Sequence, residues 1–267
     1  MKINKILNLF IVSLVLILSA CDSTVDEETL GNTSTLDDVE LTATQSTTGG
    51  NEITLDMTTP GVTGYWDYVI GKGLTDRTTF VFPVTGTFDF NFVGTLGSEF
   101  FEKSVSVTID NLDTPVAPEW AALLGNDAVA GKTWVFDGTG GDDELWYFMS
   151  VPGDPESAFS VWWNAGGTCC PPPDVNGKMK FDLDGKPNFT YQSDPSADEE
   201  TGLFVLNTDN MTLQIVGSNI LGGADSGQGG YNPSAQYDII SLTETELILY
   251  YGAGQWGSGW TWVFRPE

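Results

Sequence analysis

Apolar and polar residues alternate with a period of two along most of the chain from Val39 onward. This period places every second side chain on the same face of an extended strand, so each segment suits a strand with one face in a core. Gly-, Thr- and Asp-rich clusters separate the segments, as expected for turns. The alternating segments are Val39–Ala43, Ile53–Met57, Phe80–Phe82, Phe88–Phe92 and Val105–Ile109, followed by about ten short runs between Lys132 and Phe264. An all-β fold is predicted.

Prolines divide this pattern into two domains. Pro115 and Pro118 end the first set of strands, and a short helix is predicted from Glu119 to Leu124, with Gly125 ending it. The first set predicts an Ig-like β-sandwich, and the second predicts a jelly-roll-like β-sandwich with an Asp184-Gly185 hairpin turn. The predicted boundaries are 38–112 for the first domain, 113–130 for the linker with its helix, and 131–267 for the second domain.

The N-terminus predicts export and a lipid anchor. Lys2 and Lys5 precede an apolar run from Ile6 to Leu18, which is typical of a signal peptide. The following Leu-Ser-Ala-Cys resembles the bacterial lipobox, which implies that residues 1–20 are removed and that Cys21 is acylated. The alternative is a plain secretory signal followed by a cysteine. Residues 21–37 are acidic, rich in Ser and Thr and without apolar periodicity, and they predict a flexible tether.

The acidic residues that follow Cys21 bear on the final location. Asp22, Asp26, Glu27 and Glu28 resemble the surface-export signal of Bacteroidota lipoproteins, which implies an outer-membrane protein facing the cell exterior. In enteric bacteria, an Asp directly after the cysteine would instead indicate retention at the inner membrane. A solvated linker is compatible with either location.

Net charge and the lack of histidine exclude several classes of function. Loss of residues 1–20 leaves 8 of the 10 basic residues against 37 acidic ones, a formal net charge of −29. Such a surface repels nucleic acid and anionic membranes. The absence of histidine excludes Ser-His-Asp and Cys-His catalysis as well as histidine-containing metal sites. A paired-carboxylate glycosidase is the main catalytic design that remains, and no carboxylate pair stands out.

No cofactor is predicted. The acidic cluster Asp142, Asp143 and Glu144 has the oxygen ligands that calcium prefers, but its spacing matches no calcium motif. A solvated loop is the preferred interpretation, and a structural calcium ion is the alternative.

The first domain resembles a PKD domain, an immunoglobulin-like spacer module. The resemblance rests on YWDYVIG, TTFVFPVTGTFDFNFVGT and KSVSVTID within residues 38–112. The Trp-Asp-Phe-Gly-Asp-Gly motif of that family is replaced here by WDYVIGKG. The resemblance implies a spacer without chemistry of its own.

The second domain resembles the C-terminal domain of PKD-containing surface glycan-binding lipoproteins, which accompany starch-utilisation-type transport systems in Bacteroidota. GKTWVFDG, VWWNAG, GKMKFDLDG and the last strand pair, YDIISLTETELILYYGAGQWGSGWTWVFRP, carry the resemblance. It implies noncatalytic capture of polysaccharide, with a TonB-dependent transporter complex as an expected partner. The His-Gly-bearing loop of the family is DGTGGDDELWYFMSVPGDPES here, so glycan specificity cannot be carried over.

Aromatic residues supply the predicted binding site, because flat rings stack on the C–H faces of sugars. Trp134, Phe136, Trp260, Trp262 and Phe264 alternate within strands and are predicted core residues. Trp162 and Trp163 are neighbours on one strand and must point to opposite faces, and Trp163 is predicted to be the exposed one. Trp256 lies between glycines and is predicted to be presented to a ligand. The predicted glycan-binding residues are Trp163, Trp256, Tyr231, Trp146, Asn164 and Gln255.

Cys169 and Cys170 are adjacent, and Cys21 is expected to be acylated. In an oxidising compartment the two can bond to each other or remain thiols. A bond between neighbours, followed by Pro171, Pro172 and Pro173, would make a stiff apolar platform beside a tryptophan. The alternative is a rigid loop that protects a sheet edge.

These observations favour a noncatalytic lipoprotein that captures a neutral polysaccharide or oligosaccharide. A structural or adhesion lipoprotein that binds a protein partner is the first alternative, and a glycoside hydrolase is the second.

Overall fold

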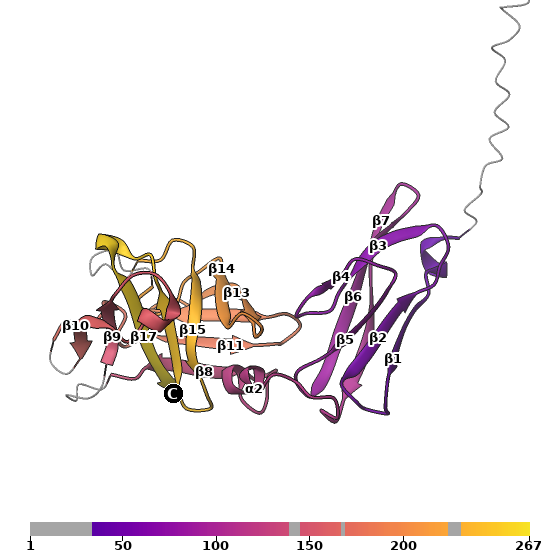
Figure 1. Ribbon diagram of the computed structural model, residues 1–267. Coiled ribbons are helices and arrows are strands. Elements are labelled where there is room, and N and C mark those ends of the chain that lie inside the picture. The colour runs from indigo at the N-terminus through magenta and orange to yellow at the C-terminus, as the bar shows by residue number, and fades with distance from the viewer. Residues whose placement is uncertain (1–33, 139–144, 167–168, 224–230) are drawn as a thin grey trace, which may run out of the picture.

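The structure is a computed structural model that describes residues 34–138, 145–166, 169–223 and 231–267. The chain forms two β domains joined by a short helix (Figure 1). The predicted all-β class is confirmed.

The first domain is a two-sheet sandwich. β1 (Leu41–Gln45), β2 (Glu52–Met57) and β5 (Arg77–Val81) form one sheet, and β4 (Lys72–Gly73), β3 (Val62–Asp67), β6 (Gly86–Leu96) and β7 (Glu99–Ile109) form the other. The alternating apolar residues point between the sheets, and Ile53, Leu55, Phe90 and Phe92 are fully buried. The 3-10 helix η2 (Leu36–Asp38) precedes β1.

Helix α2 (Pro118–Leu124) connects the domains and confirms the predicted helix. Pro118 starts the helix, where its missing N–H costs nothing, and Gly125 ends it with a φ of 78°, a conformation that suits glycine. Leu123 and Leu124 are buried, and the Leu123 carbonyl accepts a hydrogen bond from Trp134 Nε1 at 3.0 Å. The helix is therefore fixed to the second domain.

The second domain is one antiparallel sheet that closes on itself. Its strands are β8 (Lys132–Phe136), β9 (Leu145–Ser150), β10 (Val161–Gly166), β11 (Lys178–Asp182), β12 (Asn188–Gln192), β13 (Glu200–Asn207), β14 (Thr212–Val216), β15 (Gln236–Leu242), β16 (Leu247–Tyr251) and β17 (Gly259–Pro266). β11 to β17 pair in sequence order, and β8 pairs with both β11 and β17. These eight strands form a closed barrel.

This closed barrel replaces the expected two-sheet jelly roll. The strands lie where the alternation predicted them, including the hairpin at Asp184-Gly185. Alternation is the same in a sandwich and a barrel, because both have one buried face. The difference lies in the pairing of β17 with β8, which joins segments from opposite ends of the domain.

The barrel interior is filled with side chains. Trp134, Met179, Phe181, Leu213 and Trp262 are fully buried there, and most inward residues of the remaining barrel strands are buried as well. An eight-stranded barrel is just wide enough to be filled in this way. Ligands are therefore expected at the rim or on the outer surface.

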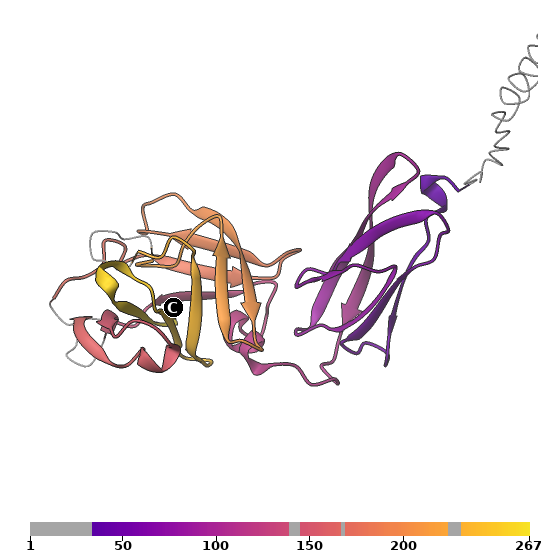
Figure 2. The same cartoon turned by 45° about the horizontal axis from the view of Figure 1, so that its top comes forward.

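Strands β9 and β10 extend the sheet beyond the barrel. The first half of β17, Gly259–Trp262, pairs with β9, whereas its second half, Phe264–Pro266, pairs with β8. The β9–β10 pair lies at the end of the molecule away from the first domain (Figures 1 and 2). We call this end, with the β9–β10 and β16–β17 loops, the distal end.

Candidate functional site

Two loops meet at the distal end. The β16–β17 loop and the β9–β10 loop are joined by a hydrogen bond from Gly153 N–H to the Gly252 carbonyl at 2.9 Å. A side chain on Gly252 would collide with the carbonyl oxygen of Gly153, so this close approach requires glycine. Tyr250 Oη also donates to the Val151 carbonyl at 2.6 Å. The two loops thus form one connected surface.

Trp256 projects from this surface. It lies in the 3-10 turn η4 (Gln255–Gly257) with a φ of 62°, and its side chain is 69 % exposed. Buried Ser258 fixes the turn, because its hydroxyl donates to the Gln255 carbonyl at 2.6 Å and accepts from Trp260 Nε1 at 2.9 Å. Trp256 is therefore exposed, as presentation to a ligand would require, on a backbone held by hydrogen bonds.

An aromatic cluster supports Trp256 from below. The ring centroid of Trp256 lies 6.4 Å from that of Trp260, which in turn lies 6.1 Å from Trp163 and 5.4 Å from Tyr147. Trp260 and Tyr147 are buried, and Trp163 is partly buried. Trp256 is the exposed member of a packed cluster.

The prediction that Trp163 is the exposed tryptophan of its pair is wrong. Trp162 is 55 % exposed, whereas Trp163 packs on the core against Tyr147 and Trp260. The two neighbours do face different environments, as predicted. Trp163 shares its face of β10 with the fully buried Ala165, and a register shift sets Trp162 outside this alternation.

Of the four other predicted site residues, three are accessible to solvent and one is buried. Gln255 lies beside Trp256, and Tyr231 is 39 % exposed just before β15, at the same end of the barrel. Asn164 is exposed on β10 opposite Phe148, on the other face from Trp163. Trp146 is 7 % exposed, and its Nε1 donates to the Gly138 carbonyl at 2.5 Å. The prediction that Trp146 contacts a ligand is therefore wrong, because its ring is packed and its N–H is paired.

A shallow groove adjoins the Trp256 loop and contains residues that the sequence analysis missed. Its volume is about 480 Å³, and it is lined by the start of β15, the end of β16 and both distal loops. Asp154, Ser234, Gln236, Asp238 and Tyr251 supply its polar groups. Carboxylates, amides and hydroxyls of this kind bind sugar hydroxyls. The signal in the sequence was an acid, Asp238, inside the largely apolar run YDIISL.

Burial raises the pKa of the Asp238 carboxyl above its ordinary value of 3.8. Burial also raises the pKa of Tyr250, and the negative charges of Asp238 and Asp154 add to this effect. Tyr250 is the register partner of Asp238 on β16. Both carboxylates of the groove therefore raise the pKa of the same tyrosine.

Replacing Asp238 with asparagine is expected to raise the melting temperature at pH 7. The raised pKa means that ionisation of Asp238 opposes folding, and this cost develops as the pH rises above the unfolded-state pKa. Below that pKa both states are protonated, so the gain should disappear at about pH 3. Thermal melts at both pH values measure it.

The matched control is Asp209→Asn, which removes an equal charge from the exposed β13–β14 turn. This control measures the stabilisation that the loss of any one negative charge gives, because the negative charges of this acidic chain repel one another. Equal gains in the two variants at pH 7 would contradict the effect of burial at Asp238.

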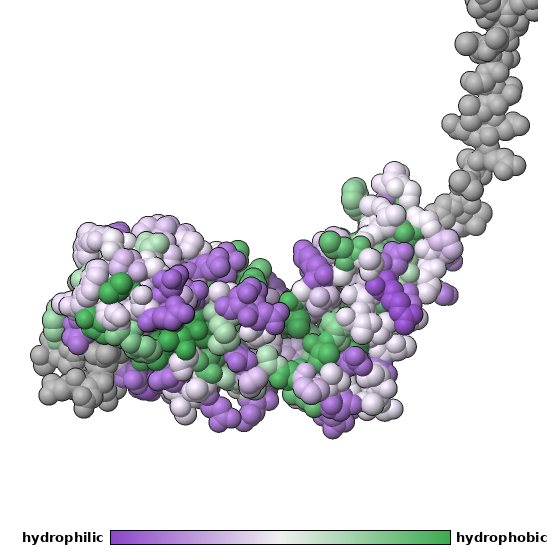
Figure 3. All heavy atoms as spheres, viewed as in Figure 1, coloured by the Kyte–Doolittle hydropathy of each residue, from purple (hydrophilic) through white to green (hydrophobic). Residues whose placement is uncertain are grey.

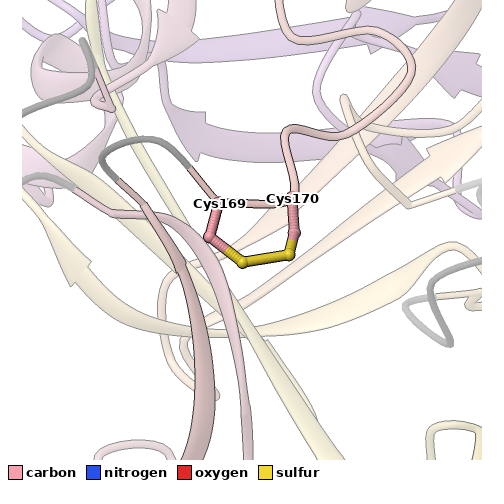
Figure 4. Close-up of a disulfide and its surroundings, with 2 residues drawn as sticks. All are labelled: Cys169 and Cys170. Carbon is pink, nitrogen blue, oxygen red and sulfur yellow. A yellow bond between two sulfur atoms is a disulfide. The ribbon is translucent and has the colours of Figure 1, made fainter.

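The adjacent cysteines are bonded in the structure, in agreement with the predicted pairing. Figure 4 shows the Cys169–Cys170 disulfide, whose Cα atoms lie 3.7 Å apart. Cys169 is exposed, and Cys170 packs against the core with a φ of 61°. The bond lies where β10 leads toward β11, at the rim on the same side of the barrel as the distal loops.

Asp174 anchors the segment after the prolines. It is buried, and its Oδ2 accepts hydrogen bonds from Tyr191 Oη at 2.8 Å and from Gly222 N–H at 2.9 Å. Burial raises the pKa of Tyr191 strongly, and the nearby Asp174 charge adds to it, so the phenol keeps its proton and donates. The disulfide segment is thereby tied to β12 and to the β14–β15 loop.

The part of the chain that the structure describes contains no group of three or more His, Cys, Asp or Glu side chains that could hold a metal ion. The acidic cluster Asp142, Asp143 and Glu144 lies outside the described residues, as does Cys21. Within the described ranges no helix is long and apolar enough to cross a membrane.

No protein-family model matches the chain, and no curated protein matches it. We therefore infer the function from the residues and their geometry.

Proposed function

We propose that this chain is a noncatalytic cell-surface lipoprotein that captures a neutral polysaccharide or oligosaccharide for uptake. The observation that carries the proposal is Trp256, which is 69 % exposed on a turn fixed by Ser258. An exposed ring on a rigid support loses little conformational entropy when a sugar stacks on it. The neighbouring groove offers Asp154, Gln236 and Asp238 to the hydroxyl groups.

The arrangement of the domains also supports capture. The aromatic cluster lies at the distal end, and the first described residues lie at the opposite end of the molecule (Figure 1). A chain anchored at Cys21 would then hold its binding loops away from the membrane, with the first domain as the spacer. We also propose that this first domain is a PKD-like module.

Affinity electrophoresis in gels that contain starch, laminarin, xyloglucan or galactomannan tests the function. Retardation by at least one of them, without release of reducing sugar, is the expected result. Absence of retardation in all four gels would contradict capture of a neutral polysaccharide. Release of reducing sugar would instead favour a hydrolase, with Asp154 and Asp238 as its candidate carboxylates.

A protein partner is the second candidate, and the edge strand β10 is the observation that favours it. β10 pairs with β9 alone among the described strands, and it exposes Val161 and Trp162, with Phe159 59 % exposed just before it. Exposed edges with apolar side chains are suited to strand addition. If Trp162→Ala abolished co-purification with an outer-membrane transporter and left glycan retardation unchanged, the edge would be assigned to the partner.

Replacing Cys21 with serine is expected to release the protein from the membrane fraction. Serine lacks the sulfur that carries the lipid, so a single change removes the anchor. Fractionation followed by immunoblotting measures the release, and Cys169→Ser, whose position lies outside the lipobox, is the control. A Cys21→Ser protein that is processed normally and stays in the membrane fraction would contradict the anchor.

A further inference from the structure

A second groove lies between the two domains, far from the distal loops. Its volume is about 540 Å³, which is within the range of small-molecule sites. The outer face of β3, β4 and β6 forms one wall, and the β11–β12 turn with β13 forms the other. Apolar residues (green) gather at the junction of the domains in Figure 3. Domain interfaces are preferred positions for ligand sites.

The wall from the first domain is polar. Asp67 on β3 is the register partner of both Lys72 on β4 and Asn91 on β6, so the three form a row across the sheet. Their neighbours Trp66 and Phe92 are fully buried, which places the row on the outer face. Asp89 follows two residues from Asn91 on the same face. The row presents carboxylate, amide and ammonium groups to the groove.

The wall from the barrel is largely apolar. Leu203 and Val205 point outward from β13 and are 37 % and 52 % exposed. Trp120 of α2 also lines the groove, and its ring centroid lies 6.4 Å from that of Phe204, which points from β13 into the barrel. Lys186, in the β11–β12 turn, is exposed at the groove. An apolar surface with a flat ring thus faces a row of hydrogen-bonding groups.

The loop between β3 and β4 is held in an unfavourable conformation at this groove. Val69 has a φ of 72°, which is an outlier for a β-branched residue. Tyr68 holds the loop, because its ring stacks on Phe80 at 4.1 Å and its N–H donates to the Gly71 carbonyl at 3.0 Å. Strain of this kind occurs preferentially at functional sites. This loop belongs to the segment WDYVIGKG, where the chain departs from the PKD motif.

The charges of the groove are balanced, although the chain has a net charge of −27. Lys72 and Lys186 face Asp67 and Asp89, and among the described residues none of the four forms a salt bridge. A balanced set of charges without ion pairs favours a neutral ligand with many hydroxyl groups over an ion. A sugar has this character, with polar edges and an apolar face.

We propose that the interdomain groove is a second carbohydrate subsite, which takes a neutral sugar segment of the same polysaccharide. The inference rests on the proposed function. The polar row binds the hydroxyl groups, and Trp120 with Leu203 and Val205 covers the apolar face of the sugar. Because the two sites are far apart, a long chain can occupy both and gain avidity, whereas a short oligosaccharide binds each site separately.

Isothermal titration with maltohexaose, laminarihexaose, a xyloglucan oligosaccharide and mannohexaose, one probe for each polysaccharide of the gels, tests the subsite. The wild-type protein is expected to bind two molecules of at least one probe. The double variant Asn91→Ala/Lys186→Ala should bind one, with an unchanged melting temperature, because both side chains are solvent-accessible. Its affinity for the corresponding polysaccharide should fall about tenfold or more through lost avidity. The matched control is Asn111→Ala/Lys178→Ala, which makes the same substitutions outside the groove and should bind two.

The outcomes separate the subsite from the proposed function. A single binding event that Trp256→Ala removes and the groove variant leaves intact would overturn the subsite while capture stands. A single event that the groove variant removes and Trp256→Ala leaves intact would support the subsite and reject the distal site. A wild-type protein that binds none of the four probes would overturn both.

Discussion

Replacing Trp260 with alanine is expected to lower the free energy of unfolding of the barrel by about 3–5 kcal/mol. The side chain is 1 % exposed, and its ring lies within 6.4 Å of Tyr147, Trp163 and Trp256. Alanine leaves a cavity among these rings and removes the hydrogen bond to Ser258 Oγ. Chemical denaturation followed by circular dichroism measures the loss.

Leu74→Ala is the control, because this side chain is 80 % exposed on the first domain and should change stability by less than about 0.5 kcal/mol. The loss from Trp260→Ala should appear in the unfolding of the barrel and leave that of the first domain unchanged. A loss below about 1 kcal/mol would show that the cluster can relax around the deletion, and would contradict its role as a rigid support for Trp256.

Replacing Trp256 with alanine is expected to weaken glycan binding by about 1–3 kcal/mol, roughly 5- to 150-fold in Kd. Stability should change little, because the ring is 69 % exposed and its loop is held by Ser258 rather than by the ring. Titration with the polysaccharide that retards the wild-type protein, and thermal melting of the same sample, measure the two effects.

Phe100→Ala is the matched control, since its ring is 86 % exposed at the β6–β7 hairpin of the first domain. Loss of binding in this variant as well would indicate nonspecific hydrophobic adsorption. A large fall in melting temperature for Trp256→Ala would place the ring in the core and remove it from the site.

The alternation of apolar and polar side chains predicted the strands, because the burial of one face of each strand produces this pattern within a few residues. Trp260, Trp262 and Phe264 could be placed in the core for this reason, and all three are buried. Barrel closure could not be predicted, because it depends on β17 pairing with β8 across the whole domain. Composition and alternation carry no information about that long-range register.

The candidate site was predictable where a local signal was strong. Flanking glycines and the absence of a regular strand singled out Trp256, and the two adjacent cysteines predicted their own bond. The exposure of Trp162 and Trp163 was misassigned because two neighbouring tryptophans give no local signal of which one faces the core. Asp154 and Asp238 were missed because only the folded chain brings their distant segments to one groove.

The division of β17 between two partners has a mechanical consequence. A polysaccharide held at Trp256 would pull on the N-terminal end of β17, while the anchor would pull on the N-terminal end of β8 through α2. Since the two strands are antiparallel neighbours, these pulls act at opposite ends of their ladder and load it in shear. In shear the ladder hydrogen bonds share the force instead of opening one at a time. Under the proposed function, the strand that closes the barrel would therefore also bear the tension between a captured polymer and the cell.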